Sequence, residues 1–229
     1  MNFPKSDYKE YPKTLARDDL WGQVRRTVNG KPVSAEQISM IVDAIRNGLR
    51  LQSDDVVLDL ACGNGALANQ FFDKCAALHG VDSSEYLIEI ANERFRVPGK
   101  TSFEVDDVAH YVNNAPDAVH FTKVLCYGSF SFFSETEANG VLDGVSRRFQ
   151  NVRRIMIGNL PDASRAHLFY PKGKAFAGEL KDRNAQIGIW RSESELRDVA
   201  SAFGWTLTIV PMPSAFYAAH YRFDAILTR

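Results

Sequence analysis

Short apolar runs alternate with segments of helical periodicity along most of the chain. Apolar residues recur at helical spacing after Ser34 and predict a helix over residues 34–49, which ends near Gly48. Ser34 followed three positions later by Gln37 is typical of a capping box. The alternation continues to about residue 203, and this order indicates a parallel sheet with helices on both faces.

The apolar runs predict strands, and the periodic segments between them predict helices. The predicted strands span residues 55–60, 76–81, 101–105, 118–125 and 153–158. The further predicted helices span residues 65–74, 84–95, 135–149 and 193–203.

The end of the chain departs from this alternation. Residues 205–212 and 221–228 both have the pattern of strands, and only residues 213–220 separate them, beginning with Pro213. A parallel crossover needs about a dozen residues, usually with a helix, so these two strands must pair antiparallel. We therefore predict a Rossmann-like three-layer α/β sandwich. Its seven-stranded, mostly parallel sheet ends in a C-terminal antiparallel hairpin.

Composition places the chain among ordinary globular proteins. It has 229 residues, 45% hydrophobic and 24% charged, which suits one main domain over residues 34–229 with a polar arm over residues 1–33. A net charge of −1 argues against nucleic acid as a partner. We expect no membrane span and no signal peptide, and the pattern points to no particular oligomeric state. Three widely spaced cysteines favour reduced thiols and a cytoplasmic protein.

A glycine turn follows the first strand of the main domain, in VVLDLACGNGALA (residues 56–68). Gly63, Gly65 and Ala68 formally match the dinucleotide pattern G-x-G-x-x-G/A. Asp59 lies four positions before Gly63 and would face a pyrophosphate with like charge. The same carboxylate would favour the ammonium and sulfonium groups of S-adenosylmethionine, so the turn indicates that cofactor over a dinucleotide.

Further acidic residues end the next two strands. Asp82 closes LHGVD and suits a pair of ribose hydroxyls, in either cofactor. Asp106 and Asp107 follow SFEV, where a side-chain acceptor can take the adenine amino group.

LDLACGNG, VDSS and FEVDDV resemble the first three motifs of the class I S-adenosylmethionine-dependent methyltransferases. The resemblance covers roughly residues 35–229 and implies the antiparallel hairpin as well as the cofactor. Asp107 matches the adenine-side acid of the family better than Asp106 does. The cofactor-binding residues that the motifs imply are Asp59, Ala61, Gly63, Asn64, Gly65, Asp82, Ser83, Asp106, Asp107 and Val108.

A narrower resemblance concerns WGQVRRTVNGKPVS, IGNLPD and HYRFDAIL. These stretches are similar to a bacterial subgroup associated with surface-polysaccharide or secondary-metabolite pathways. The expected acceptor is therefore a small molecule, such as a sugar or nucleotide-sugar derivative.

Residues after the fourth and fifth strands are expected to face the acceptor, because ligands bind at the carboxyl ends of parallel strands. Tyr127 and Asn159 are the candidates there, whereas Phe132 and Phe133 are expected in the core. His167 and Tyr170 are the candidates for a general base. The five histidines show no metal-ligand spacing, so we expect no metal site.

The arm carries a large aromatic beside polar and basic residues, which favours a lid over the site. We expect Trp21 to cover the pocket, Gln23 to bond a ligand, and Arg25 or Arg26 to pair with an anionic group. Two other functions stay open: a non-catalytic S-adenosylmethionine-binding protein and an NAD(P)-dependent oxidoreductase.

Overall fold

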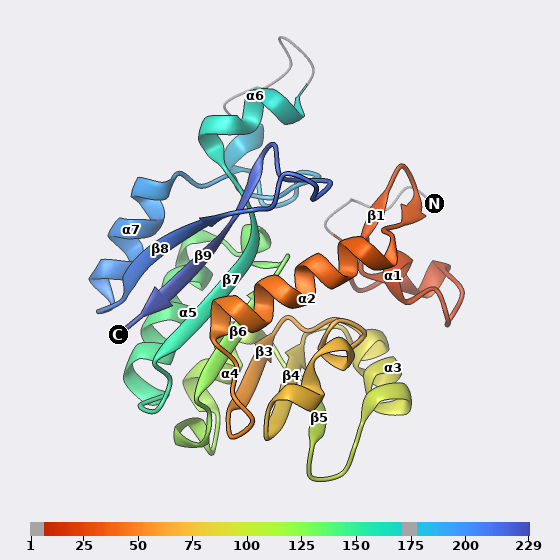
Figure 1. The fold of residues 1–229 in the computed structure, drawn as a ribbon, viewed down its shortest axis with the longest axis vertical. Helices are drawn as coiled ribbons and strands as arrows, with labels where there is room; N and C mark the ends of the chain where they lie inside the picture. Colours follow the sequence, from red (N-terminus) through yellow and green to blue (C-terminus); the bar gives the residue numbers. More distant parts are fainter. Residues whose placement is uncertain (1–6, 171–177) are drawn as a thin grey trace.

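A seven-stranded sheet forms the centre of the computed structural model, which describes residues 7–170 and 178–229 (Figure 1). From edge to edge its strands are β5 (Thr101–Val105), β4 (Ala77–Asp82), β3 (Val56–Leu60), β6 (Lys123–Tyr127), β7 (Arg154–Pro161), β9 (Arg222–Thr228) and β8 (Thr206–Pro211). Strands β3 to β7 run parallel, and β9 runs antiparallel to both of its neighbours. The predicted fold class is confirmed.

The C-terminal hairpin is also confirmed. β8 and β9 pair antiparallel, with Thr206 opposite Thr228 and Pro211 opposite Phe223. Residues 213–220 form turns and no helix, because a connection that starts with a proline and is this short has no room for one.

Helices cover both faces of the sheet. In Figure 1, α2 (Ala35–Leu49) crosses the near face, and α3 (Glu85–Phe95) packs into the same apolar layer. The opposite layer contains α4 (Val108–Asn114), α5 (Glu135–Arg148) and α7 (Glu193–Ala202). Strand β3 shows how one apolar run serves both layers. Val57 packs toward α2, while Leu58 and Leu60 pack toward α5.

Serine side chains accept a capping hydrogen bond at the start of three of these helices, and two of these caps are complete capping boxes. Ser134 and Ser192 each exchange backbone and side-chain hydrogen bonds with a glutamate three residues on. The side chain of Ser34 accepts from the backbone of Gln37, at 3.4 Å. The Gln37 amide instead bonds the backbone of Ala215 and Tyr217, so the predicted box at α2 is only half formed and Gln37 ties α2 to the hairpin loop.

Two predicted elements differ from the observed ones. Residues 65–74 form no α-helix, because two 3₁₀ turns (Ala68–Gln70 and Phe72–Lys74) meet at Phe71, whose φ of −142° and ψ of −2° are not helical. The strand predicted over 118–125 begins only at Lys123, because a 3₁₀ turn occupies Ala118–His120. Helix α4 was not predicted.

The arm, residues 7–33, lies outside the sheet, and residues 1–6 of the predicted lid fall outside the described residues. It contains the short helix α1 (Leu20–Gln23) and a hairpin of β1 (Thr27–Val28) and β2 (Lys31–Pro32). Arg17 fastens the arm to α3 through ion pairs with Glu89 at 2.9 Å and Glu93 at 2.5 Å. No helix in the described ranges is long and apolar enough to cross a membrane.

Candidate functional site

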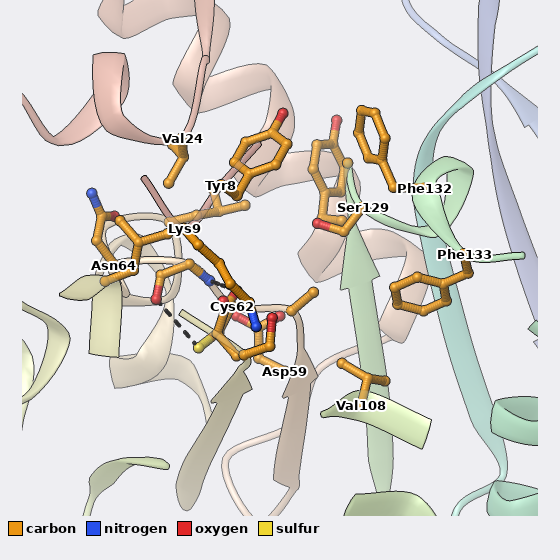
Figure 2. A pocket seen from close by; sticks show the side chains of 18 of the residues that line it. Tyr8, Lys9, Val24, Asp59, Cys62, Asn64, Val108, Ser129, Phe132 and Phe133 are labelled. Carbon is orange, nitrogen blue, oxygen red and sulfur yellow. Dashed lines mark hydrogen bonds between the residues drawn. The ribbon is translucent and has the colours of Figure 1, made fainter. Parts of the chain in front are cut away.

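A cavity of about 410 Å³ lies at the carboxyl ends of the parallel strands, and this volume is typical of small-molecule sites. The loops after β3, β4, β5 and β6 line it, together with the arm and part of α5. Figure 2 shows Tyr8, Phe132 and Phe133 projecting around this space, with Asp59 at the strand end. The strand order makes this edge the common meeting point of motifs that are far apart in the sequence.

Asp59 closes β3 and is only 3% exposed. Burial raises the pKa of its carboxyl to about 7, while the Arg26 guanidinium opposes that rise. The next residue but one, Ala61, has a positive φ of 57°, so the chain turns sharply away from the strand. A buried carboxylate that has no cation in contact favours a positively charged ligand.

The glycine turn is built for close approach. Gly63 and Gly65 have φ values of 60° and 74°, which favour glycine. A Cβ on Gly63 would lie 2.9 Å from Cγ1 of Val24 on the arm, and one on Gly65 would press on Phe103. The loop is thus fixed between the arm and the sheet.

Asn64 and Gln23 join the turn to the arm. The Asn64 amide donates to Leu20 O at 2.8 Å and to Gln23 Oε1 at 2.9 Å. Gln23 is fully buried and its Nε2 donates to Ala16 O. Asn64 still borders the cavity, whereas Gln23 does not. This corrects the expected role of Gln23, because both ends of its amide are bonded to the protein and none is left for a ligand.

Asp82 at the end of β4 organises the same turn. Its Oδ2 accepts from Gly63 N at 2.8 Å and its Oδ1 accepts from Ser84 N at 2.9 Å. Burial raises the pKa of this carboxyl, and the backbone donors oppose the rise. Each oxygen keeps a second lone pair for a ribose hydroxyl. Ser83 also borders the cavity.

The two aspartates after β5 have different surroundings. Asp107 caps α4 by accepting from His110 N at 2.9 Å, and it borders the cavity with Val108. Asp106 instead places its Oδ1 2.9 Å from Nδ1 of His110, and it lies outside the cavity lining. Of the two aspartates expected at the site, the structure brings Asp107 to the cavity and does not bring Asp106 there.

The arm contributes Tyr8, Lys9, Trp21, Val24 and Arg26 to the cavity lining. The side chain of Arg25 instead stacks on the Tyr11 ring, 3.5 Å from its centroid, and does not border the cavity. Of the two arginines expected to meet an anion, only Arg26 faces the site.

Residues after β6 form the remaining wall, with Tyr127, Gly128, Ser129, Phe132 and Phe133 in the lining. Phe132 and Phe133 are half-buried and point into this space (Figure 2), which corrects the expectation that they belong to the core. The 3₁₀ turn Phe130–Phe132 buries Phe130 and directs Phe132 and Phe133 toward the cavity.

The candidate bases do not reach this site. His167 is exposed on α6 (Ala166–Phe169), and Tyr170 packs on Trp190 with centroids 5.8 Å apart. Neither borders the cavity, because the chain leaves the sheet edge after Pro161. Asn159 lies behind the lining, next to Gly128.

Sequence reasoning missed several lining residues, among them Tyr8, Lys9, Glu137 and Arg183. Glu137 occupies the third position of α5 in its capping box and pairs with Arg183 at 2.7 Å. The box was readable from the sequence, but the long-range pair was not. No group of three or more potential metal ligands occurs among the described side chains.

Residues 57–151 match the family model described as a methyltransferase domain. An uncharacterized methyltransferase of Schizosaccharomyces pombe is 24% identical over 143 residues, 58% of this chain and 45% of that protein. Ribosomal RNA small subunit methyltransferase A of Prochlorococcus marinus is 31% identical over 71 residues, 31% of this chain and 26% of that protein. The chain thus spans less than half the length of these curated relatives.

Solved structures resemble the whole fold at low identity. The methyltransferase domain of bacterial CtHen1 has a TM-score of 0.63 at 16% identity, covering 84% of this chain and all of that one. Magnesium protoporphyrin IX methyltransferase from Synechocystis PCC 6803, solved with bound S-adenosylmethionine, has a TM-score of 0.58 at 18% identity, covering 95% and 97%. By the family model, residues 57–151 are similar to a methyltransferase domain, and the sheet order is that of the fold shared with these solved methyltransferases.

Proposed function

We propose that this protein transfers a methyl group from S-adenosylmethionine to a small molecule. One observation carries the proposal: Asp59, Asp82 and Asp107, from the ends of three neighbouring strands, all border one cavity. They suit, in order, the cationic methionine end, the ribose hydroxyls and the adenine amino group of that cofactor. When bound, the cofactor supplies the electrophilic methyl group. We call these three residues and Gly63 the donor half of the cavity.

The same geometry disfavours the oxidoreductase alternative. In a dinucleotide site the pyrophosphate would approach the glycine turn, where Asp59 lies buried four residues before Gly63. A carboxylate there repels a phosphate and attracts a sulfonium.

The described chain supplies orientation and shielding to the reaction. Tyr8, Trp21 and Val24 of the arm cover one side of the cavity, which supports the lid interpretation. Alignment of the acceptor with the methyl group in such a site can contribute up to roughly 7–11 kcal/mol. His167 and Tyr170 lie outside the cavity lining, so we no longer propose them as bases.

For the acceptor we keep a small molecule, with a sugar or nucleotide-sugar derivative as the candidate from the subgroup resemblance. Support comes from Tyr8, Phe132 and Phe133, whose rings offer flat apolar faces to a ring-shaped acceptor. The three cysteines are free thiols, which suits the proposed cytoplasmic setting. The near-neutral net charge argues against a nucleic-acid partner.

Titration calorimetry with S-adenosylhomocysteine, NADH and NADPH tests the cofactor. We expect micromolar binding of S-adenosylhomocysteine and none of the nucleotides. Binding of NADH or NADPH alone would refute the proposal. Donor consumption is then followed with labelled S-adenosylmethionine and a panel of nucleotide sugars and small metabolites. Cofactor binding without transfer to any member would favour the non-catalytic alternative.

A further inference from the structure

Arg26 is a half-buried cation with a buried donor atom that has no hydrogen-bond partner. Its guanidinium lies 5.8 Å from the Trp21 ring centroid and 5.4 Å from that of Tyr127. Its Nη1 is buried without a hydrogen-bond partner, and no carboxylate in the described ranges forms an ion pair with it. Leaving such a donor unsatisfied costs free energy, so the arrangement favours a ligand that accepts from it.

A second donor converges on the same point. A Cβ on Gly128 would lie 3.7 Å from Arg26 Nη2 and also 3.7 Å from Asn159 Nδ2. Gly128 has a φ of 84° and carries no side chain, so the space between these two groups stays open. The Asn159 atom nearest this space is the donor Nδ2, whereas its Oδ1 is an acceptor that is buried without a partner and does not bind an anion.

Asn159 is held in place by buried charged groups on β9. Its φ of 62° is unusual for a residue other than glycine. Its backbone N donates to Asp224 Oδ1 at 2.8 Å, and Arg222 Nη1 donates to its carbonyl oxygen. Arg222 and Asp224 are 8% and 3% exposed. This frame fixes the Asn159 amide beside Gly128 and sets it up for recognition.

The surroundings of this point are more basic than the donor half. Burial raises the pKa of the Tyr217 hydroxyl, and both Arg222 and Arg26 oppose that rise. The same two arginines also lower the pKa of the Tyr8 hydroxyl, which burial raises. Asp224 is the buried acid of the frame, and one of its oxygens is already used by Asn159 N. Asp59 is the other carboxylate that the Arg26 guanidinium influences, but the two form no ion pair in the described part of the chain, so Arg26 keeps donors for an anion.

We propose that the acceptor carries an oxyanion, a carboxylate or a phosphate, which binds above Gly128 between the Arg26 guanidinium and the Asn159 amide. This inference rests on the proposed function, because it assigns the acceptor to the same cavity. A planar guanidinium and an amide N–H offer parallel donors to one oxyanion. The aromatic rings of Phe132 and Phe133 are left for the uncharged body of the acceptor.

The carboxylate of the cofactor is the other possible source of such an oxyanion. The position favours the acceptor, since Asn159 lies in β7, two strands away from β3, whose Asp59 is assigned to the methionine end of the cofactor. Comparing S-adenosylhomocysteine with 5′-methylthioadenosine, which lacks the methionine carboxylate, separates the two sources.

The experiment uses the full chain saturated with S-adenosylhomocysteine. Calorimetry measures binding of 4-hydroxybenzoate against 4-hydroxybenzamide, and of glucose 1-phosphate against glucose. We expect at least one anion to bind roughly 10- to 100-fold more tightly than its neutral partner. Arg26→Gln and Asn159→Asp should each remove that preference, and Arg25→Gln, the matched control on the Tyr11 ring, should keep it.

The inference would be overturned if the wild-type protein preferred no anion at millimolar concentration, or if the preference survived in both variants. It would also be overturned if Arg26→Gln lowered the affinity for S-adenosylhomocysteine but not for 5′-methylthioadenosine, because the oxyanion would then be the cofactor's own carboxylate. Failure of S-adenosylhomocysteine to bind the wild-type protein would instead refute the proposed function, so the two failures are distinguishable.

Discussion

The cavity has two halves that the chain builds in different ways. The donor half comes from three local motifs, each a strand end with its following turn, and its titratable groups are acids. The acceptor half, around Gly128, combines Arg26 from the arm, Tyr127 at the end of β6 and Asn159 at the irregularity within β7. Local motifs specify a common cofactor, whereas groups assembled over long sequence distances leave the acceptor free to differ between relatives.

The largest effect that would sharpen this contrast is expected for Gly63→Val. The new side chain must adopt a φ of 60° and would press on Val24, so S-adenosylhomocysteine affinity should fall by about 100-fold or more. Gly99→Val is the matched control, because Gly99 has a φ of 75° and no atom near its Cβ position. It should lower the melting temperature without changing affinity. Equal affinities of the two variants in calorimetry would show that the turn does not hold the donor.

A smaller loss is expected for Asp82→Ala. Removing this carboxylate takes away a charged acceptor for the ribose and two bonds to the turn, a cost of about 1.5–3 kcal/mol in cofactor binding. Asp106→Ala, one strand away and turned to His110, should change affinity by less than about 0.5 kcal/mol. Wild-type affinity in Asp82→Ala would break the assignment of the donor half.

The smallest effect concerns pH. The Asp59 carboxyl has a pKa of about 7 in the ligand-free protein, and a cationic donor requires its ionised form. Affinity for S-adenosylmethionine should therefore rise by about tenfold between pH 6 and pH 8, with proton release on binding. Calorimetry in buffers of different ionisation enthalpy measures that release. Asp59→Asn should bind more weakly and show a flat profile, and an unchanged slope in this variant would assign the titration to another group.

The same pKa has an opposite consequence for stability. The folded protein retains a proton that the unfolded chain, with an aspartate pKa of about 3.9, has already released. The contribution of Asp59 to the free energy of unfolding therefore falls as pH rises from about 4 to about 7.

The sheet was predictable because its evidence is periodic and local. Each apolar run became a strand, and the short connection at Pro213 decided the direction of the last two. The error at residues 65–74 arose because the non-helical backbone of Phe71, a residue that tertiary packing buries fully, interrupts the helical spacing. Local propensity does not report that packing.

The site was predictable to the extent that it follows strand ends. Asp59, Asp82 and Asp107 are placed by the sheet alone, so their meeting could be predicted. Gln23 could not be assigned, since its partner Asn64 is 41 positions away and only the folded arm brings them together. Arg183 likewise borders the cavity beside Glu137, which is 46 positions away in the sequence and pairs with it only in the fold.

The attachment of the arm by Arg17 bears on the catalytic cycle. Spent cofactor must leave and fresh cofactor must enter past the arm, and Arg17 holds the arm to α3 through exposed ion pairs. Exposed pairs of this kind contribute little to stability and weaken with salt. The contact with α3 can therefore open while the Asn64 bonds to Leu20 and Gln23 keep the rest of the arm in place, and we expect cofactor exchange to be the step whose rate increases with ionic strength.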